Sequence, residues 1–208
     1  VGPSGCGKTT LLNMAAGLVA HSGQGSLEVQ GRSPVQGNHQ VGYMLARDSL
    51  LPWKTALGNA MFGMDVRGVP KAESEQRARQ MLTQVGLSGF ENALPKALSH
   101  GMRQRVALAR TFAMGSPLLL MDEPFGALDA QTKLQLEDLL LALCQQYQQS
   151  VLFVTHDLSE AVAVSDRVVV MSSRPGKIVA DVEIDLPRPR SIRELQKNPH
   201  FHESISPS

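Results

Sequence analysis

The sequence predicts an α/β fold with a mainly parallel sheet, and two observations lead to this prediction. Short apolar runs at 41–44, 118–121, 151–155 and 168–171 alternate along the chain with longer segments of helical periodicity. Each run has the length and composition of a strand that is covered on both faces, as strands of a parallel sheet are. A glycine-rich turn at residues 2–9 opens the first helical segment, and this order of turn and helix is common in α/β folds.

The helical segments follow from apolar spacing and from the residues that end them. The segment 71–87 is the clearest, because Ala78, Met81 and Val85 fall on one face and Gly86 stops the helix. The full set of expected helices is 10–16, 71–87, 102–114, 131–149 and 159–165.

The remaining segments are less regular. Residues 23–41 are rich in turn formers, and we expect two short strands among them. Near the other end, Val182, Ile184 and Leu186 alternate with acidic residues, which predicts a half-exposed antiparallel strand at a sheet edge. From Pro187 onward the chain is rich in Pro and Arg, and we expect it to be loose or bound at the surface.

The composition excludes several functional classes. The 208 residues carry a net charge of +1, so there is no basic excess to neutralise a nucleic acid, and we expect no nucleic-acid partner. Two cysteines give no disulfide framework, which suits a reducing compartment. No run approaches the roughly 18 apolar residues that span a bilayer, so any role at a membrane requires a membrane-embedded partner.

The turn at residues 2–9 matches the phosphate-binding pattern G-x-x-x-x-G-K-[ST] in full. Its glycines let backbone N–H groups surround phosphate oxygens, Lys8 supplies positive charge, and the Thr9 hydroxyl suits Mg²⁺. The helix that follows adds the favourable dipole of its N-terminus. The candidate nucleotide-binding residues are Gly2, Pro3, Ser4, Gly5, Cys6, Gly7, Lys8, Thr9 and Thr10.

Two carboxylates, Asp122 and Glu123, directly follow the apolar run 118–121. At the carboxyl end of a buried strand they enter the crevice where α/β sheets bind ligands. Asp122 is placed to hold Mg²⁺ together with Thr9, and Glu123 is placed to polarise an attacking water. The alternative is that the two carboxylates form a solvated pair in a loop without a catalytic role. The phosphate-binding turn upstream favours a role in phosphoryl transfer.

With these parts in place, the chain resembles the nucleotide-binding subunits of ATP-binding cassette (ABC) transporters. Five segments match that family in order: 2–9, 98–105 with the sequence LSHGMRQR, 121–124, 127–129 and 155–157. The co-occurrence of all five is far more specific than any one of them.

The resemblance implies a P-loop NTPase fold, in which a core with a mainly parallel sheet carries an inserted helical subdomain. The nucleotide-binding domain is expected at 1–186, with a RecA-like core at 1–45 and 115–186 and a helical subdomain at about 46–114. A C-terminal extension at 187–208 follows it.

The resemblance also implies how the site works. Two subunits are expected to form a head-to-tail homodimer with ATP and Mg²⁺ at the interface. Ser99 and Gly101, where a helix begins, would face the γ-phosphate bound by the other subunit. Asp129 would lie across the interface between the two subunits. His156 would contact the γ-phosphate and hold the water and Glu123, so Glu123 and His156 are the expected catalytic residues.

Three further segments, 50–53, 186–190 and 198–203, resemble those of the importers of nitrate, sulfonate, taurine and related solutes. They are less specific than the five motifs above. The implied function is ATP hydrolysis at the cytoplasmic face of the membrane that drives import through permease subunits, with an external solute-binding protein as an indirect partner. Trp53 is either a core aromatic or part of the groove that receives the permease.

Three positions depart from the family pattern. His100 stands where a second glycine is usual, and Met102 replaces a glutamine. Ala46 aligns with a glutamine that reaches Mg²⁺ and the attacking water, so we expect slower hydrolysis or weaker coupling with ATP binding preserved. The alternatives are therefore a nucleotide-binding module with impaired turnover and, from another class, a non-transport cassette ATPase.

Members of the family carry several dozen residues before the phosphate-binding turn, including a strand and an aromatic that stacks on adenine. In this sequence only Val1 precedes Gly2. We therefore expect an N-terminally truncated member whose 208 residues alone are unstable and bind ATP poorly.

Overall fold

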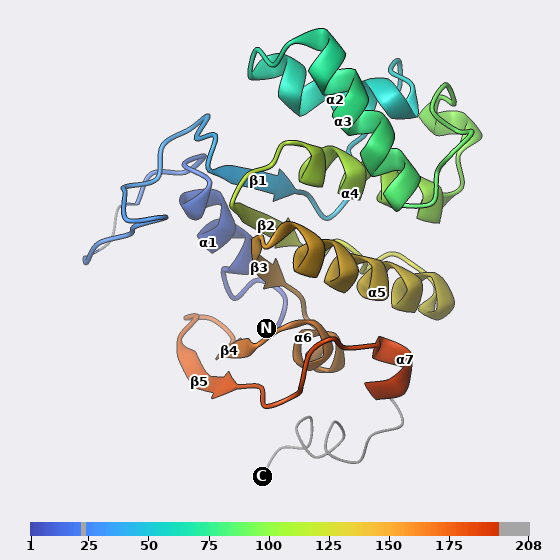
Figure 1. Cartoon of the computed structure of the whole chain (residues 1–208). Helices are drawn as coiled ribbons and strands as arrows, with labels where there is room; N and C mark the ends of the chain where they lie inside the picture. Colours follow the sequence, from blue (N-terminus) through green and yellow to red (C-terminus); the bar gives the residue numbers. More distant parts are fainter. Residues whose placement is uncertain (22–23, 196–208) are drawn as a thin grey trace.

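Helices and strands alternate through the computed structural model, which describes residues 1–21 and 24–195 (Figure 1). The helices are α1 (Lys8–Ala15), α2 (Ala56–Val66), α3 (Lys71–Gln84), α4 (His100–Ala113), α5 (Ala130–Tyr147), α6 (Leu158–Val164) and α7 (Ile192–Leu195), with a 3₁₀ turn η1 (Pro95–Ala97). The strands are β1 (Val41–Met44), β2 (Leu118–Asp122), β3 (Ser150–Val154), β4 (Arg167–Met171) and β5 (Ile178–Glu183). No helix of residues 1–21 and 24–195 is both long enough and apolar enough to cross a bilayer.

Strands β1, β2 and β3 form a parallel sheet with β2 in the middle. Leu118 pairs with Val41 on one side and with Ser150 on the other, and Asp122 pairs with Val154. The prediction of an α/β fold with a parallel sheet is therefore confirmed. Because all three strands run the same way, their carboxyl ends meet at one edge of the sheet.

The alternating side chains of β2 connect the two layers of helices. Leu119 and Met121 pack into the apolar cluster made with α4 and α5, whereas Leu120 packs against Leu12 of α1. All three β2 side chains are fully buried, and each such burial contributes about 1.5–3 kcal/mol. A strand covered on both faces needs a continuous apolar run, which is the pattern of 118–121.

Helices α2, α3 and α4 pack together on one side of the sheet, at the top of Figure 1. The pattern of the sequence does not predict α2, because apolar residues lie on more than one of its sides, Phe62 and Val66 being exposed. Its buried apolar residues share one face and are Ala56, Leu57, Ala60, Met61 and Met64. The local sign of the helix is Thr55, whose hydroxyl accepts a hydrogen bond from the Gly58 N–H (3.1 Å) as an N-cap does.

Strand β4 differs from the prediction of a buried strand at 168–171. It pairs antiparallel with β5 in a separate two-stranded sheet, and within it only Val168 is buried. On its other side lies a cleft of about 750 Å³ that is also lined by β3. Val1 lines this cleft and bonds to β4: its backbone nitrogen donates to the Val169 carbonyl (2.8 Å), and its carbonyl accepts from the Met171 N–H (2.8 Å). The strand has a partner on one side and a cleft on the other, which explains its partial exposure.

The expectation of two short strands within 23–41 is wrong. In the described part of this segment the backbone forms one isolated bridge, between Val29 and Arg32. The two residues between them, Gln30 and Gly31, both have positive φ and form a tight turn of the kind that closes hairpins. Only Val29 is buried there, so no apolar face exists to extend the pairing. The antiparallel edge strand predicted near 182–186 is confirmed as β5, with earlier bounds.

Residues 187–195 are docked on the rest of the chain, so this segment follows the second of the two expected alternatives, loose or bound at the surface. Ile192 and Leu195 of α7 are buried in a cluster with α6, and Arg188 forms an ion pair with Asp166 (2.8 Å). The Arg190 guanidinium donates to the Ser165 carbonyl (2.6 Å). The segment 198–203, one of the subgroup marks, lies outside the described residues.

A buried amide organises the turn before α2, and this gives a prediction about stability. The fully buried Asn59 accepts from the Leu51 N–H (2.7 Å), and its amide nitrogen donates to the carbonyls of Leu51, Lys54 and Thr55. Asn59→Leu should lower the free energy of unfolding by about 2–3 kcal/mol, because the Leu51 N–H and the Lys54 carbonyl lose their side-chain partner. Urea unfolding monitored by circular dichroism measures this. The exposed Asn92→Leu is the control, and a change at residue 59 as small as the control's would contradict the prediction.

Candidate phosphate-binding and catalytic site

The phosphate loop, residues 2–9, leads directly into α1. Gly5 and Gly7 adopt positive φ angles of 78° and 105°, which residues with a Cβ rarely adopt. The first backbone bond of the helix runs from the Leu11 N–H to the Gly7 carbonyl (2.9 Å), so the preceding N–H groups have no partner within the helix. A helix start of this kind offers donors and a positive dipole end to an anion.

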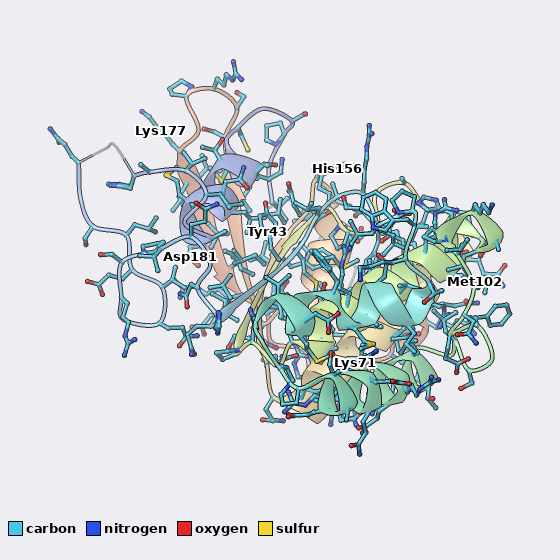
Figure 2. All side chains as sticks on the ribbon, turned by 90° about the horizontal axis from the view of Figure 1, so that it is seen from above. Tyr43, Lys71, Met102, His156, Lys177 and Asp181 are labelled. Atoms are coloured by element: carbon cyan, nitrogen blue, oxygen red, sulfur yellow. The ribbon has the colours of Figure 1, made fainter. Side chains whose placement is uncertain are left out.

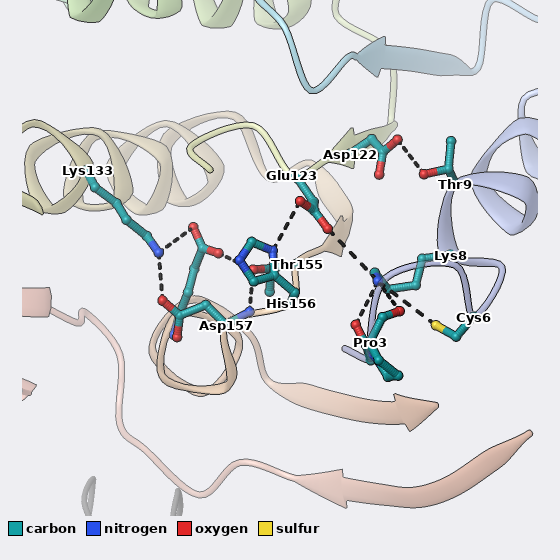
Figure 3. A network of polar contacts seen from close by, with 12 residues as sticks. Pro3, Cys6, Lys8, Thr9, Asp122, Glu123, Lys133, Thr155, His156 and Asp157 are labelled. Atoms are coloured by element: carbon teal, nitrogen blue, oxygen red, sulfur yellow. Dashed lines mark hydrogen bonds and ion pairs between the residues drawn. The ribbon is translucent and has the colours of Figure 1, made fainter. Parts of the chain in front are cut away.

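Lys8 is buried beneath the loop, with 7% of its side chain exposed. Its ammonium donates to the carbonyls of Gly2 (2.7 Å) and Pro3 (3.0 Å), and it lies 3.9 Å from a carboxylate oxygen of Glu123 (Figure 3). These contacts place one positive charge between the loop and the end of β2. The charge is only weakly screened there, because solvent reaches little of the side chain.

The turn between β4 and β5 packs against the other side of the phosphate loop. Arg174 donates from Nε to the Gly5 carbonyl (3.0 Å). A Cβ on Gly176 would lie 2.2 Å from the Cys6 carbonyl oxygen, and one on Gly2 would lie 2.8 Å from the Met171 carbonyl oxygen. Backbone approaches this close require glycine at both positions.

Thr9 and Asp122 meet directly, although 113 positions separate them in the sequence. The Thr9 hydroxyl donates to a carboxylate oxygen of Asp122 at 2.8 Å, and Asp122 is 7% exposed. Both supply hard oxygen donors, and Mg²⁺ is commonly bound by one or two carboxylates together with substrate phosphates. The two predicted metal ligands therefore fit the ion in kind and in position.

Glu123 adopts a left-handed backbone conformation with φ of 44°, which is uncommon for a residue that has a side chain. Its N–H donates to the Val154 carbonyl (2.8 Å), and this bond ties the end of β2 to the end of β3. One Glu123 carboxylate oxygen lies 3.1 Å from Nδ1 of His156, while the other faces Lys8 (Figure 3). A partly exposed carboxylate between a cation and an imidazole can accept a proton from water.

Polar contacts from α5 and α6 hold the loop that carries His156. The Thr155 hydroxyl donates to Glu160 and accepts from the Asp157 N–H (3.0 Å). Lys133 of α5 donates to Asp157 at 2.8 Å. Burial opposes ionisation of Asp157, but the bonds from Lys133 and from the first amides of α6 outweigh it and lower the pKa of Asp157.

Three predicted residues lie at the starts of helices. Ser99 caps α4, since its hydroxyl accepts from the Met102 N–H (3.2 Å), and Asp129 caps α5 by accepting from the Thr132 N–H (3.0 Å). A Cβ on Gly101 would lie 2.8 Å from Thr132, so the starts of α4 and α5 are in contact. Met102, in the first turn of α4, and Lys177, in the turn after β4, lie at opposite sides of Figure 2.

The loop after β1 is tied to α4 by arginines. Arg103 forms an ion pair with Asp48 (2.9 Å) and donates to the Leu98 carbonyl (3.0 Å). Arg110 donates to the backbone carbonyls of Asp48 and Ser49 (both 2.9 Å). Ala46 lies exposed in the same loop. The loop that carries Ala46 is therefore held against α4.

Sequence reasoning did not find Lys133, Glu160 or Arg174. Lys133 precedes Glu137 by four residues, a helical spacing that suggests an ion pair but not a link to the loop of His156. Arg174 precedes a Pro-Gly pair typical of turns, where an exposed arginine is ordinary. Their partners lie far away in the sequence, so no local pattern reveals these contacts.

Comparison with known proteins agrees with the site. A family model described as ABC transporter matches residues 1–126. An uncharacterized ABC transporter ATP-binding protein of Methanocaldococcus jannaschii is 48% identical over 196 residues, which cover 94% of this chain and 73% of that protein. A protein of Pseudomonas putida named taurine import ATP-binding protein TauB is 44% identical over 98% of this chain and 79% of its own length.

A solved structure supports the same conclusion for the fold. It is an ATP-binding cassette captured as a dimer in a post-hydrolysis state with ADP and Pi. The superposition gives a TM-score of 0.74 at 28% identity, and it covers 89% of this chain and 84% of the other. Both the resemblance and the expected fold class are confirmed. The chain is an ATP-binding cassette ATPase and belongs to the ABC transporter family.

Proposed function

We propose that this chain hydrolyses ATP with Mg²⁺ to drive the import of a small solute through a membrane permease. The observation that supports this best is the meeting of separate predicted residues at one edge of the parallel sheet. Lys8 lies 3.9 Å from Glu123, Glu123 lies 3.1 Å from His156, and Thr9 bonds to Asp122 (Figure 3). A phosphate cradle beside a carboxylate and a metal-ligand pair is what phosphoryl transfer to water requires.

The chain's own residues take distinct roles in this proposal. The backbone N–H groups of the loop and the Lys8 ammonium bind the β- and γ-phosphates. Thr9 and Asp122 would hold Mg²⁺, which supplies neutralisation of the phosphate charge. Glu123 orients the attacking water and accepts its proton, and His156 holds the Glu123 carboxylate in place.

The second half of each site is proposed to come from another subunit. Ser99, Gly101 and Asp129 cap or begin helices, and Met102 in the first turn of α4 lies at the opposite side of Figure 2 from Lys177, in the turn that packs on the phosphate loop. Helix α4 offers free N–H groups and the Ser99 hydroxyl at its exposed start, which suits a γ-phosphate. A head-to-tail homodimer brings this start to the partner's phosphate loop, in line with the dimeric state of the solved cassette.

The permease is proposed to contact the helical layer at Trp53. Trp53 is 72% exposed, which rules out a core position and favours a contact surface. Phe62 and Val66 of α2 are also exposed, and Lys54 lies over the Phe62 ring at 5.7 Å. Large aromatic side chains next to apolar ones are frequent anchors of protein interfaces.

The solute class follows from the relatives rather than from the site. Relatives of 43–44% identity are named taurine import proteins, and the segments 50–53 and 186–190 match the same importer subgroup. We therefore place the solute among taurine, other sulfonates and nitrate. The chain would lie at the cytoplasmic face of the membrane, with an external solute-binding protein as an indirect partner and no nucleic acid.

Glu123→Gln tests the catalytic role. The amide cannot accept the proton of water, so the steady-state ATPase rate of the assembled transporter should fall by about 100-fold or more. Binding of ATP should persist, because Lys8 and the loop remain, and a fluorescent nucleotide measures it. Glu183→Gln, an exposed site on β5, is the matched control. An unchanged ATPase rate in Glu123→Gln would remove Glu123 from the chemistry.

Ala46→Gln tests the departure from the family pattern. A glutamine there would position the attacking water, and the ATPase rate of the assembled transporter should rise by about 10-fold. Ala46→Leu adds similar bulk without an amide and should leave the rate unchanged. If the rate with glutamine equals the wild-type rate, the alanine does not limit turnover.

Trp53→Ala tests the permease contact. Loss of an aromatic anchor should weaken binding to the permease by about 10- to 100-fold, as titration of the permease in detergent would measure. Phe90→Ala truncates another exposed aromatic and should not weaken binding. Equal affinities for wild type and Trp53→Ala would place the permease elsewhere on the surface.

A further inference from the structure

Two glutamates that take no part in the proposed chemistry are buried behind the loop of His156. Glu137 of α5 and Glu160 of α6 are only 3% and 5% exposed. Burial of an ionised carboxylate is costly unless it is paired, so two at one place need an explanation. Lys133 is the cation beside them, at 3.6 Å from Glu160 and 3.9 Å from Glu137.

The pair is connected to the loop of His156 on both sides of that residue. Glu160 accepts from the Thr155 hydroxyl, and Thr155 directly precedes His156. Lys133 bonds to Asp157 at 2.8 Å, and Asp157 directly follows His156. Lys133 also stands in the first turns of α5, the helix capped by Asp129. Any change in charge at the pair is therefore transmitted to the residues that flank His156.

One oxygen of Glu160 lacks a hydrogen-bond donor. This atom, Oε1, is fully buried, and Lys133 at 3.6 Å is too far away for a hydrogen bond. The neighbouring carboxyl group of Glu137 can supply the missing donor only when it carries a proton. Burial and the charge of Glu160 raise the pKa of Glu137 to about 8, which agrees with a protonated Glu137 at neutral pH.

We propose, on the basis of the ATPase function proposed above, that Glu137 and Glu160 share one proton and act with Lys133 as positioning residues. In the protonated pair, Glu137 donates to Glu160, Glu160 accepts from Thr155, and Lys133 is free to hold Asp157. This arrangement orients His156 toward Glu123.

Loss of the proton changes the charge around Lys133. Three carboxylates, those of Glu137, Asp157 and Glu160, then compete for one ammonium, and the two glutamates repel each other. No titratable residue faces the pair from β3, and the charged residues of α7, Arg193 and Glu194, are exposed. Because the pKa of Glu137 is raised in the folded chain, stability from the shared proton is present below the ordinary pKa and is lost as the pH rises through about 8.

The test compares Glu137→Gln with Glu137→Leu in the full chain and in the assembled transporter. Wild type should show a decline in kcat above about pH 8, and because glutamine donates to Glu160 at any pH, this decline should disappear in Glu137→Gln. Leucine has no donor, so kcat should fall by about 10- to 100-fold at every pH with little change in KM for ATP. Glu75→Gln, in an exposed ion pair on α3, is the matched control and should keep the wild-type profile.

Infrared spectroscopy of the full chain tests the proton without turnover. Wild type should show a protonated carboxyl band at pH 7 that vanishes as the pH rises through about 8, and Glu137→Gln should lack that band. If wild type lacks the band, or if Glu137→Gln keeps the alkaline decline in kcat at the same pH, the shared proton is refuted. A wild-type transporter without ATPase activity would overturn the proposed function, and the infrared band would still decide whether the proton is there.

Discussion

The parallel pairing of β2 between β1 and β3 is the constraint on which the rest of the molecule depends. It places the end of β2 beside the end of β3, and the bond from the Glu123 N–H to the Val154 carbonyl fixes this junction. Asp122 and Glu123 from one strand thereby share an edge with His156 from the next. The same strand buries Leu120 against α1, which sets the phosphate loop above Asp122. A slip of one residue in this register would turn the carboxylate pair away from the loop.

Much of this arrangement could be predicted from the sequence, because its determinants are local. The run 118–121 is apolar throughout, as a strand covered on both faces must be, and acids follow it at once. The phosphate loop carries its glycines in a fixed pattern. The apolar run at 168–171 has the same local appearance as β2, yet it forms an antiparallel pair beside a cleft. The partner of a strand, which a single sequence does not show, decides how deeply the strand is buried.

The residues of the site, predicted and unpredicted, fall into two groups for a similar reason. Lys8, Thr9, Asp122, Glu123 and His156 meet because parallel strands end together, a rule that follows from the fold class alone. The supporting contacts of Lys133 and Arg174 join positions far apart in the chain, and no periodicity marks them. Glu137 looks like an ordinary polar residue of an amphipathic helix, and only its packing against α6 makes it unusual.

The turn between β4 and β5, which comes late in the sequence, packs against the phosphate loop and supports its shape. The bond from Arg174 to Gly5 and the close approach of Gly176 to Cys6 hold the loop in one shape. A loop that is already ordered loses little conformational entropy when an anion enters it, so more of the interaction energy appears as affinity. Residues about 170 positions downstream thus help to set how tightly the first nine residues can hold a phosphate.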